Sequence, residues 1–202
     1  NAGIERIYGI TGDSLNSVND SLRRNGKIAF EHVRHEETAA FAAGAEASLT
    51  GKLTVCAGSS GPGNLHLING LFDCHRNRVP VLAIASHIPQ SEVGLNYFQE
   101  THPENLFKEC SCFCELISNP KQMPEILFRA MNAAVGNQDV AVIVLPGDVA
   151  VMETEIDELP VWHHPRLPHI VPQREDIEEM SAHLEKGERI TLFCGAGCEG
   201  AH

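Results

Sequence analysis

The sequence is short of basic residues and of long apolar runs. Its 15 lysines and arginines stand against 27 aspartates and glutamates, which gives a formal net charge of -12. Because this excess would repel a polyanion, the composition argues against a nucleic-acid groove or an anionic membrane surface. The longest apolar stretch, 79–85, is too short to cross a bilayer, and these residues contain no charged-then-apolar signal pattern. We therefore expect a cytoplasmic protein.

The sequence also lacks the paired cysteine spacing of zinc sites. Its seven cysteines are an odd number, so we expect reduced thiols rather than a disulfide framework. Cys110, Cys112 and Cys114 alternate, and on a strand they would share one buried face. The pair His163 and His164 has no further ligand at metal spacing and is expected to be solvated. We predict no metal-ligating residue in this chain.

Apolar segments alternate with helical segments through most of the chain. The apolar segments lack polar alternation, which is typical of strands buried on both faces of a parallel sheet. Helices between such strands cover the two faces. The sequence therefore predicts a three-layer α/β fold with a parallel sheet. The predicted strands are 6–10, 28–33, 53–57, 79–85 and 141–145, and the predicted helices are 14–24, 36–49, 65–75 and 124–135.

A proline-rich stretch divides the chain. Between 152 and 172 the periodicity fails and four prolines follow one another at short intervals, so we expect a linker there. A helix at 174–185 and a buried strand at 190–194 then predict the start of a second α/β domain at 173–202, after a first domain at 1–151. The chain opens without methionine almost directly on a strand and ends soon after another. We therefore expect it to be a piece of a longer protein.

Glu36 is the most informative single residue. It follows an apolar strand and opens the small-residue helix 36–49, so its carboxylate is predicted to point into a packed interior. Burying an unpaired ionised carboxylate is costly, so such a group keeps a proton or meets a partner that shares one. Either outcome suits an acid/base catalyst. Glu37 is turned about 100° away, and a first-turn charge that complements the helix dipole explains it.

A glycine-rich turn, GSSGPGN at 58–64, lies between a predicted strand and a predicted helix. Glycines permit close backbone approach, and the free amides of a helix start favour polar or anionic ligands. No Gly-Lys-Ser/Thr follows, so this is not a Walker loop. A purely structural tight turn is the alternative. Ligands of α/β sheets sit at the carboxyl ends of strands, where this turn, Thr11, Gly12 and Glu36 all fall.

Taken together, these motifs resemble the pyrimidine-binding domain of thiamine-diphosphate enzymes of the pyruvate oxidase and acetolactate synthase family. The resemblance spans nearly the whole chain. It rests on YGITGDS at 8–14, RHEE at 34–37, GSSGPGN at 58–64, NGL at 69–71, PVL at 80–82 and YFQET at 97–101. Segments 66–77 and 145–150 are most similar to the quinone-linked pyruvate oxidases within the family.

The resemblance assigns roles on the cofactor side of a site. Glu36 is expected to bond N1' of the cofactor's aminopyrimidine and so to activate the cofactor. The turn would pack against this ring, mostly through its backbone. The residues expected to bind the cofactor are Thr11, Gly12, Glu36, Gly61, Pro62, Gly63 and Asn64. The implied activity is oxidative decarboxylation of pyruvate to acetate and CO2, with electrons passing through FAD to a quinone or to oxygen.

The resemblance also assigns residues to the substrate side. Phe98 would be an aromatic wall, and Gln99 an amide that hydrogen-bonds the pyruvate-derived group. An exposed-loop phenylalanine that only covers the core is the alternative for Phe98. His66 matches a family histidine. Two roles are open for it, one in proton transfer near the substrate and one that is only structural.

Further cofactors and partners follow from the resemblance alone. Gly195, Gly197 and Gly200 form G-x-G-x-x-G after a predicted strand, and the start of the family's FAD-binding domain falls here, so Gly195 and Gly197 are expected to contact FAD. The family binds the diphosphate and Mg²⁺ through a Gly-Asp-Gly motif in another domain, and these residues lack it. The family's sites form between subunits, which implies a homo-oligomer, a dimer of dimers. Peripheral contact with the inner membrane would come from a region outside these residues.

Three alternatives stay open at this point. An acetolactate synthase shares the glutamate, the glycine turn and the Phe-Gln-Glu segment. It differs because it joins a second keto acid to the enamine formed from the first. A truncated module that serves only in subunit assembly would retain the fold without catalysis. A nicotinamide dehydrogenase, suggested only by the terminal glycines, leaves about the first 170 residues unexplained. Without the diphosphate domain, we expect these residues alone to be inactive and to bind thiamine diphosphate weakly or not at all.

Overall fold

A computed structural model describes residues 2–155, 161–166 and 170–198. The chain forms two compact units, residues 1–167 and residues 168–202, each of which is described by itself. Among the described residues, no helix combines the length and the apolarity needed to span a bilayer.

The first unit is built on a six-stranded sheet in which every neighbouring pair is parallel. The strand order is β2-β1-β3-β4-β6-β5, so the order reverses beside β1. This confirms the predicted parallel α/β architecture. The strands are β1 (Arg6–Gly9), β2 (Ala29–His32), β3 (Thr54–Gly58), β4 (Val81–His87), β5 (Phe113–Leu116) and β6 (Val140–Pro146).

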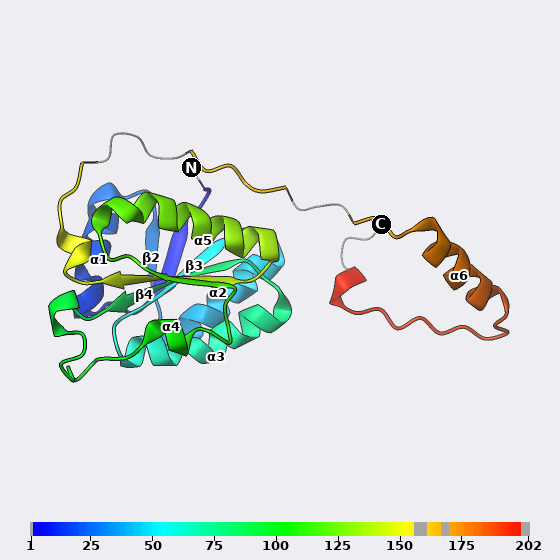
Figure 1. Cartoon of the computed structure of the whole chain (residues 1–202), viewed down its shortest axis with the longest axis horizontal. Coiled ribbons are helices and arrows are strands. Elements are labelled where there is room, and N and C mark those ends of the chain that lie inside the picture. The colour runs from blue at the N-terminus through cyan, green and yellow to red at the C-terminus, as the bar shows by residue number, and fades with distance from the viewer. Residues whose placement is uncertain (1, 156–160, 167–169, 199–202) are drawn as a thin grey trace. The chain divides into compact units, whose positions relative to one another are not determined.

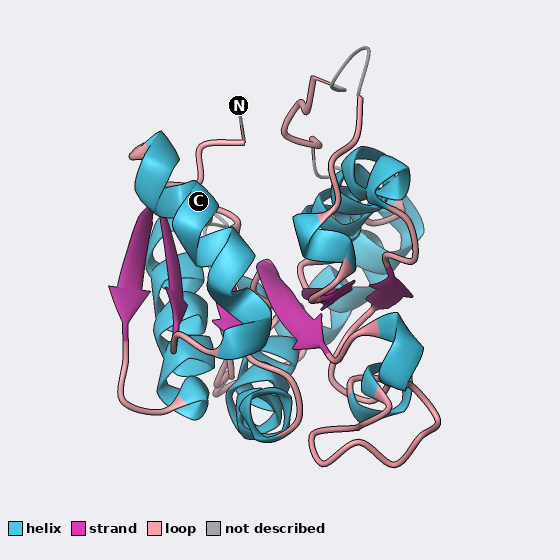
Figure 2. Cartoon of the chain, turned by 90° about the vertical axis from the view of Figure 1, so that its left-hand side faces the viewer, coloured by secondary structure: helices cyan, strands magenta, loops and turns pink. Residues whose placement is uncertain are grey.

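Helices cover both faces of this sheet (Figure 2). In Figure 1, α5 lies on one side of the strands and α3 on the other. The apolar side chains of α1 and α5 join one buried cluster, and those of α2 and α3 join a second. The helices are α1 (Asn16–Asn25), α2 (Glu36–Thr50), α3 (Pro62–Asn77), α4 (Pro103–Leu106) and α5 (Met123–Asn137).

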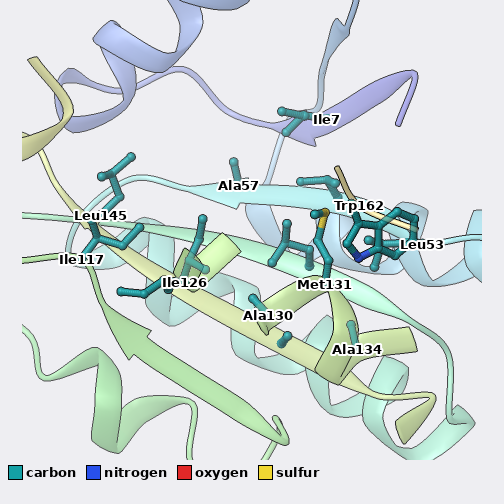
Figure 3. Packing of buried hydrophobic residues seen from close by; sticks show 14 of the residues in the cluster. Ile7, Leu53, Ala57, Ile117, Ile126, Ala130, Met131, Ala134, Leu145 and Trp162 are labelled. Carbon is teal, nitrogen blue, oxygen red and sulfur yellow. The ribbon is translucent and has the colours of Figure 1, made fainter. Parts of the chain in front are cut away.

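The central strands supply side chains to both clusters by strict alternation. On β6, Ala141, Ile143 and Leu145 face the α5 side, whereas Val142 and Val144 face the α3 side. Successive side chains of a strand point to opposite faces, so an unbroken apolar run is buried on both. Figure 3 shows the α5-side cluster, in which residues of α5 pack against Ile7, Ala57 and Leu145. The three layers therefore follow directly from the apolar runs of the sequence.

Helices α2 and α3 cross at unusually small residues. A Cβ atom added to Gly70 would lie 2.5 Å from Cβ of Ala40 and 2.9 Å from the carbonyl oxygen of Glu37. One helical turn further along α3, the Cys74 thiol contacts the carbonyl oxygen of Ala40 at 3.4 Å. Because α3 has no Cβ at position 70, its backbone approaches α2 closely. This approach fixes where the first turns of the two helices lie relative to each other.

Most predicted elements of the first unit are confirmed to within a few residues, but the cysteine segment differs from its prediction. Only Cys114 lies on a strand, β5, whereas Cys110 and Cys112 precede that strand in turns. Cys110 is buried and Cys112 is exposed, so the three thiols do not share one buried face. The reason is that β5 is an edge strand of four residues that begins only at Phe113.

The stretch after β6 is attached to the first unit by its tryptophan. Trp162 is 7% exposed and packs in the α5-side cluster (Figure 3). Its indole N–H donates to Oδ1 of Asn132 on α5 at 3.0 Å. Residues 161–166 thus belong to the first compact unit, and the domain boundary expected at 151 stays a prediction.

The second unit contains α6 (Arg174–Glu185), which matches the predicted helix, and a short 3-10 turn at Ala196–Cys198. The predicted buried strand at 190–194 is wrong. The segment is not paired with any strand among the described residues, and Leu192 and Phe193 are 73% and 100% exposed. An apolar run becomes a strand only when a neighbouring strand accepts its backbone hydrogen bonds, and the described part of this unit offers none.

Candidate active site at the carboxyl edge of the sheet

The turns after β1 and β3 lie together at the point where the strand order reverses. The amide of Ser60 donates to Oγ of Ser14 at 3.0 Å, and the hydroxyl oxygens of Ser14 and Ser59 are 3.3 Å apart. A Cβ atom on Gly12 would lie 2.5 Å from Oγ of Ser59. The structure thus brings Gly12 and the glycine turn into contact, and Thr11 is exposed beside them. In open α/β sheets this reversal point is where ligands bind.

Glu36 begins α2 at this edge of the sheet. His35 precedes it in an extended conformation, and its Nδ1 accepts from the amide of Glu37 at 3.3 Å, which caps the helix. Glu36 is 8% exposed. Its Oε2 lies 3.1 Å from Nδ1 of His66, and its Oε1 would lie 3.2 Å from a Cβ atom added to Gly63. The carboxylate is therefore buried, as the sequence predicts, and its neighbours are a histidine and a glycine backbone.

His66 projects from the first turns of α3 onto the same spot. Its side chain is 46% exposed, and its ring stacks on that of His35 with centroids 4.3 Å apart. Sequence reasoning placed His66 on the substrate side and did not include His35. The position of His35 as the residue directly before the first helical residue was the available signal.

Helix α3 begins at Pro62, three residues before the predicted start at Leu65. Proline is favoured at the first helical position because it has no N–H to leave unpaired. Pro62, Gly63 and Asn64 therefore form the first helical turn, whose N–H groups lack intrahelical acceptors. Gly61 caps the helix with φ of +68°, a conformation that favours glycine.

Asn64 is fully buried and connects α3 to the carboxyl end of β4. Its Nδ2 donates to the carbonyl oxygen of Ser86 at 2.7 Å, and its Oδ1 has no hydrogen-bond partner among the described residues. The Ser86 hydroxyl donates to the carbonyl oxygen of Ser14 at 2.7 Å. Asn64 thus holds the glycine turn against the sheet, and its side chain is covered rather than open to a ligand.

Gln99 lies over the glycine turn, whereas Phe98 faces solvent. A Cβ atom on Gly61 would lie 3.0 Å from Cβ of Gln99, and the Gln99 amide donates to the carbonyl oxygen of Ser60 at 3.4 Å. Phe98 is 83% exposed, and its ring lies 4.8 Å from that of Tyr97 between centroids. Gln99 therefore contacts the same glycine turn that lies beside Glu36, whereas Phe98 lies outside the site.

The loop that carries Gln99 is held by Glu100. Its carboxylate accepts from the amides of Gly94 at 2.6 Å and of Asn96 at 3.0 Å. The Gly94 bond, followed by that of Asn96, holds the pKa of Glu100 below its usual value. Glu37 has a different partner, since its Oε1 accepts from Nδ2 of Asn69 at 2.8 Å on the exposed α2–α3 surface. Only one of the two adjacent glutamates therefore faces the site.

This geometry agrees with the comparison against known families. The family described as "Thiamine pyrophosphate enzyme, N-terminal TPP binding domain" matches residues 1–106. The chain belongs to this thiamine pyrophosphate enzyme family. The matched range contains Glu36, both turns, His66 and the loop that carries Gln99.

Relatives of this thiamine pyrophosphate enzyme domain include several named proteins. The "Uncharacterized 42.6 kDa protein in isoamylase 3'region" of Pseudomonas amyloderamosa is 59% identical over all of this chain and 51% of its own length. Pyruvate oxidase of Lactiplantibacillus plantarum is 32% identical over 98% of this chain and 34% of its own. Acetolactate synthase isozyme 2 large subunit of Escherichia coli is 30% identical over 96% and 35%. The chain thus spans about half the length of the first relative and about a third of the others.

The residues of this domain fit the aminopyrimidine of thiamine diphosphate, which is the same compound as thiamine pyrophosphate. A buried carboxylate oxygen faces the backbone of Gly63, in a place that any other residue would fill with its Cβ. The ring of an aminopyrimidine is flat and carries hydrogen-bonding nitrogens, so it needs both a flat backbone surface and a carboxylate. Glu36 and Gly63 would hold it.

The described residues of the second unit do not fit a flavin in the same way. Gly195 and Gly197 are exposed, and an added Cβ atom at either would meet nothing within 4 Å. A dinucleotide fingerprint needs a strand directly before its glycines and a helix directly after them. Among the described residues, no strand lies between α6 and these two glycines. Gly200 lies outside the described residues.

Proposed function

We infer that this chain supplies the pyrimidine-binding half of a thiamine-diphosphate site that acts on pyruvate, with Glu36 as the proton partner of the cofactor. The observation that carries this proposal is the buried Glu36 carboxylate, whose Oε1 faces the bare backbone of Gly63 at the reversal point of the sheet. Membership of the thiamine pyrophosphate enzyme family supports it.

The role of Glu36 is to hold a proton at Oε1 and share it with a ring nitrogen. Its second oxygen is already occupied by Nδ1 of His66 at 3.1 Å, so the carboxylate is oriented before any ligand arrives. An acid that is already oriented and desolvated costs little free energy to reorganise during proton transfer. Thiamine diphosphate, when bound, supplies the carbon nucleophile that attacks the keto group of a 2-keto acid.

The substrate end of the proposed site is formed by Gln99 and His66. Ser60 and Gly61 hold Gln99 at the turn, where its amide would exchange its long bonds to Ser60 for bonds to the substrate. His66 has one nitrogen on Glu36 and a half-exposed ring, which leaves its second nitrogen for a polar group of the substrate. Phe98 would contact substrate only if its loop moves or another domain covers it, because its ring is in solvent in this chain.

The proposed reaction is the oxidative decarboxylation of pyruvate. Pyruvate and water give acetate and CO2, and the two electrons released go to a quinone or to oxygen. The similarity of segments 66–77 and 145–150 to pyruvate oxidases favours this reaction over the joining of two keto acids. Identities of 32% to a pyruvate oxidase and 30% to an acetolactate synthase are too close to separate the two. The described glycines of the second unit form no site for FAD.

The proposed site needs groups that this chain does not carry. The diphosphate and its Mg²⁺ would be held by another domain, contributed by a second copy of the full-length protein in a homo-oligomer. Glu36 and the glycine turn would then meet that domain across a subunit interface. Calorimetry on these 202 residues should accordingly show no micromolar binding of thiamine diphosphate.

The test uses the full-length protein with Glu36→Gln. The substitution retains the shape of the side chain and removes its ability to hold a proton. We expect hydrogen–deuterium exchange at C2 of the bound cofactor to slow by at least about a hundredfold, the scale of a general acid–base contribution. Glu37→Gln is the matched control and should leave the exchange rate unchanged.

Two results would overturn parts of this proposal. Unchanged exchange in Glu36→Gln would remove the role of the carboxylate. Analysis of the products from pyruvate separates the two reactions, since acetate supports the oxidase and acetolactate supports the carboligase.

A further inference from the structure

Three metal-ligating side chains converge at the start of α2. His35, Glu36 and His66 each offer one ligand atom, and these atoms all lie within 4.8 Å of one another. We propose that these three residues bind a divalent transition-metal ion such as Zn²⁺ when no aminopyrimidine occupies the site. Sequence spacing does not reveal this set, because His66 lies 30 residues after Glu36.

The distance between two of the ligand atoms already suits a shared ion. Zinc binds imidazole nitrogen at about 2.0–2.1 Å and carboxylate oxygen at about 2.0–2.2 Å, so two ligands of one tetrahedral ion are about 3.3 Å apart. Oε2 of Glu36 and Nδ1 of His66 are 3.1 Å apart. An ion could therefore replace the hydrogen bond between them without moving either side chain far.

His35 can join them if its ring turns. Its ring is stacked on that of His66 at 4.3 Å between centroids, with the two planes 27° apart. Its Nδ1 now accepts a long bond of 3.3 Å from the Glu37 amide, which leaves the ring proton on Nε2. With Nε2 as a ligand, Nδ1 would carry the ring proton and give up this bond, and Oε2 of Glu37, now 3.9 Å from Nδ1, would accept the proton after moving closer. A carboxylate behind a ligating histidine is the usual arrangement around zinc.

Both histidines are open to solvent. The His35 and His66 side chains are 45% and 46% exposed, so an ion can approach their rings from solvent beside the buried Glu36 carboxylate. Three protein ligands leave a fourth position for water, as in zinc sites that stay open. The net charge of -12 favours the approach of a cation.

The ion and the cofactor would compete for one carboxylate. This consequence rests on the proposed function, because it requires that Glu36 bind the aminopyrimidine. The ion binding itself does not, since it depends only on the three ligands. A bound transition-metal ion would thus keep the Glu36 carboxylate from the cofactor.

The test is calorimetric titration of the untagged chain with ZnCl2, after alkylation of the exposed thiols. We expect one Zn²⁺ per chain, and a loss of affinity of at least about tenfold in both His35→Gln and His66→Gln, the lower end of what metal-site substitutions cost. His75→Gln is the matched control, because His75 pairs with Asp139 at 2.7 Å away from this set. Circular dichroism establishes that each variant is folded.

The proposal is overturned if His35→Gln and His66→Gln bind Zn²⁺ as tightly as the unchanged chain. It is equally overturned if His75→Gln loses as much affinity as they do, or if no equivalent of Zn²⁺ binds. A separate arm measures thiamine diphosphate uptake by the full-length protein with and without Zn²⁺. Zinc binding that fails to slow uptake would contradict the proposed role of Glu36, whereas failure of zinc binding leaves that role untouched.

Discussion

The Cβ atom of Ala40 lies only 2.5 Å from the place where a Cβ atom of residue 70 would be, so Gly70 has no room for a side chain. Backbone atoms of Glu37 and Phe41 would be 2.9 Å away from the same position. Because these are backbone atoms of a helix, they cannot turn aside as a flexible side chain would. The spacing of α2 and α3, and with it the approach of His66 to Glu36, depends on this glycine.

We expect Gly70→Ala to lower the free energy of unfolding by about 2 kcal/mol, the middle of the range for overpacking a well-packed interior. Gly136→Ala is the matched control in α5, where an added Cβ atom meets nothing within 4 Å. It should instead raise stability by about 0.5–1 kcal/mol, because alanine loses less conformational freedom in a helix. Urea unfolding followed by circular dichroism measures both. Equal effects of the two substitutions would contradict the close crossing.

The hydrogen bond from Trp162 to Asn132 should couple the two residues energetically. Trp162→Phe and Asn132→Ala each remove one partner of a largely buried bond of 3.0 Å. In a double-mutant cycle we expect a coupling energy of about 1 kcal/mol, typical of a neutral hydrogen bond. Zero coupling in urea unfolding would mean that the segment after β6 is not attached to α5 in solution.

His87 should make the first unit less stable in acid. It is 5% exposed, and burial lowers its pKa because the charged form loses its hydration. Between this lowered pKa and the unfolded value of about 6.5, the unfolded chain binds more protons than the folded one. Stability therefore falls as pH drops below about 6.5 and is not reduced by this group above it.

We expect the urea midpoint to fall less steeply between about pH 7.5 and 5.5 in His87→Gln than in the unchanged chain, because the variant lacks the titrating group. His32→Gln, on the exposed edge strand β2, is the control and should retain the original slope. Parallel slopes for the unchanged chain and His87→Gln would show that His87 does not cause the dependence.

The seven thiols should separate into fast and slow classes. Burial is the main cause that raises the pKa of Cys110 to about 11 and those of Cys74 and Cys114 to about 12, and it raises the pKa of Cys56 well above the usual value. The thiolate is the reactive form, so these four should react slowly in the native chain. Cys112, Cys194 and Cys198 are exposed.

Ellman's reagent at about pH 8, below the usual pKa of a free thiol, should therefore label three thiols quickly. All seven should react in denaturant. Cys112 should be the slowest of the three, because burial of its sulfur raises its pKa as well. Cys112→Ser should leave two fast thiols. Rapid labelling of four or more in the native chain would contradict the packing of the cysteines.

The sequence predicts the sheet well because its central strands are buried on both faces. Such strands must be continuously apolar, and β4 and β6 are recognisable from composition alone. The same signal failed at 190–194, where an apolar run has no strand partner in the described part of its unit. Composition records a tendency to be buried, but a strand also needs a neighbour.

The site was predictable in part. Glu36 was identified because a carboxylate between an apolar strand and an alanine-rich helix is unusual. The contact between His66 and Glu36 could not be predicted, since it depends on how closely α2 and α3 cross at Gly70. Asn64 was assigned to the cofactor because it ends the glycine turn that resembles the family's, whereas the helix begins at Pro62 and turns the amide into the sheet. Its role in cofactor binding stays a prediction.

The position of β6 in the sheet has a consequence for folding during synthesis. β4 pairs with β6 along its whole length, from Val81 with Val140 to His87 with Pro146. The family match ends at residue 106, so a chain that stops there would contain every residue of the candidate site and still leave β4 as an unpaired apolar edge. A sheet that formed during synthesis would therefore expose the unpaired backbone groups of β4 until residues 140–146 had left the ribosome and paired with it.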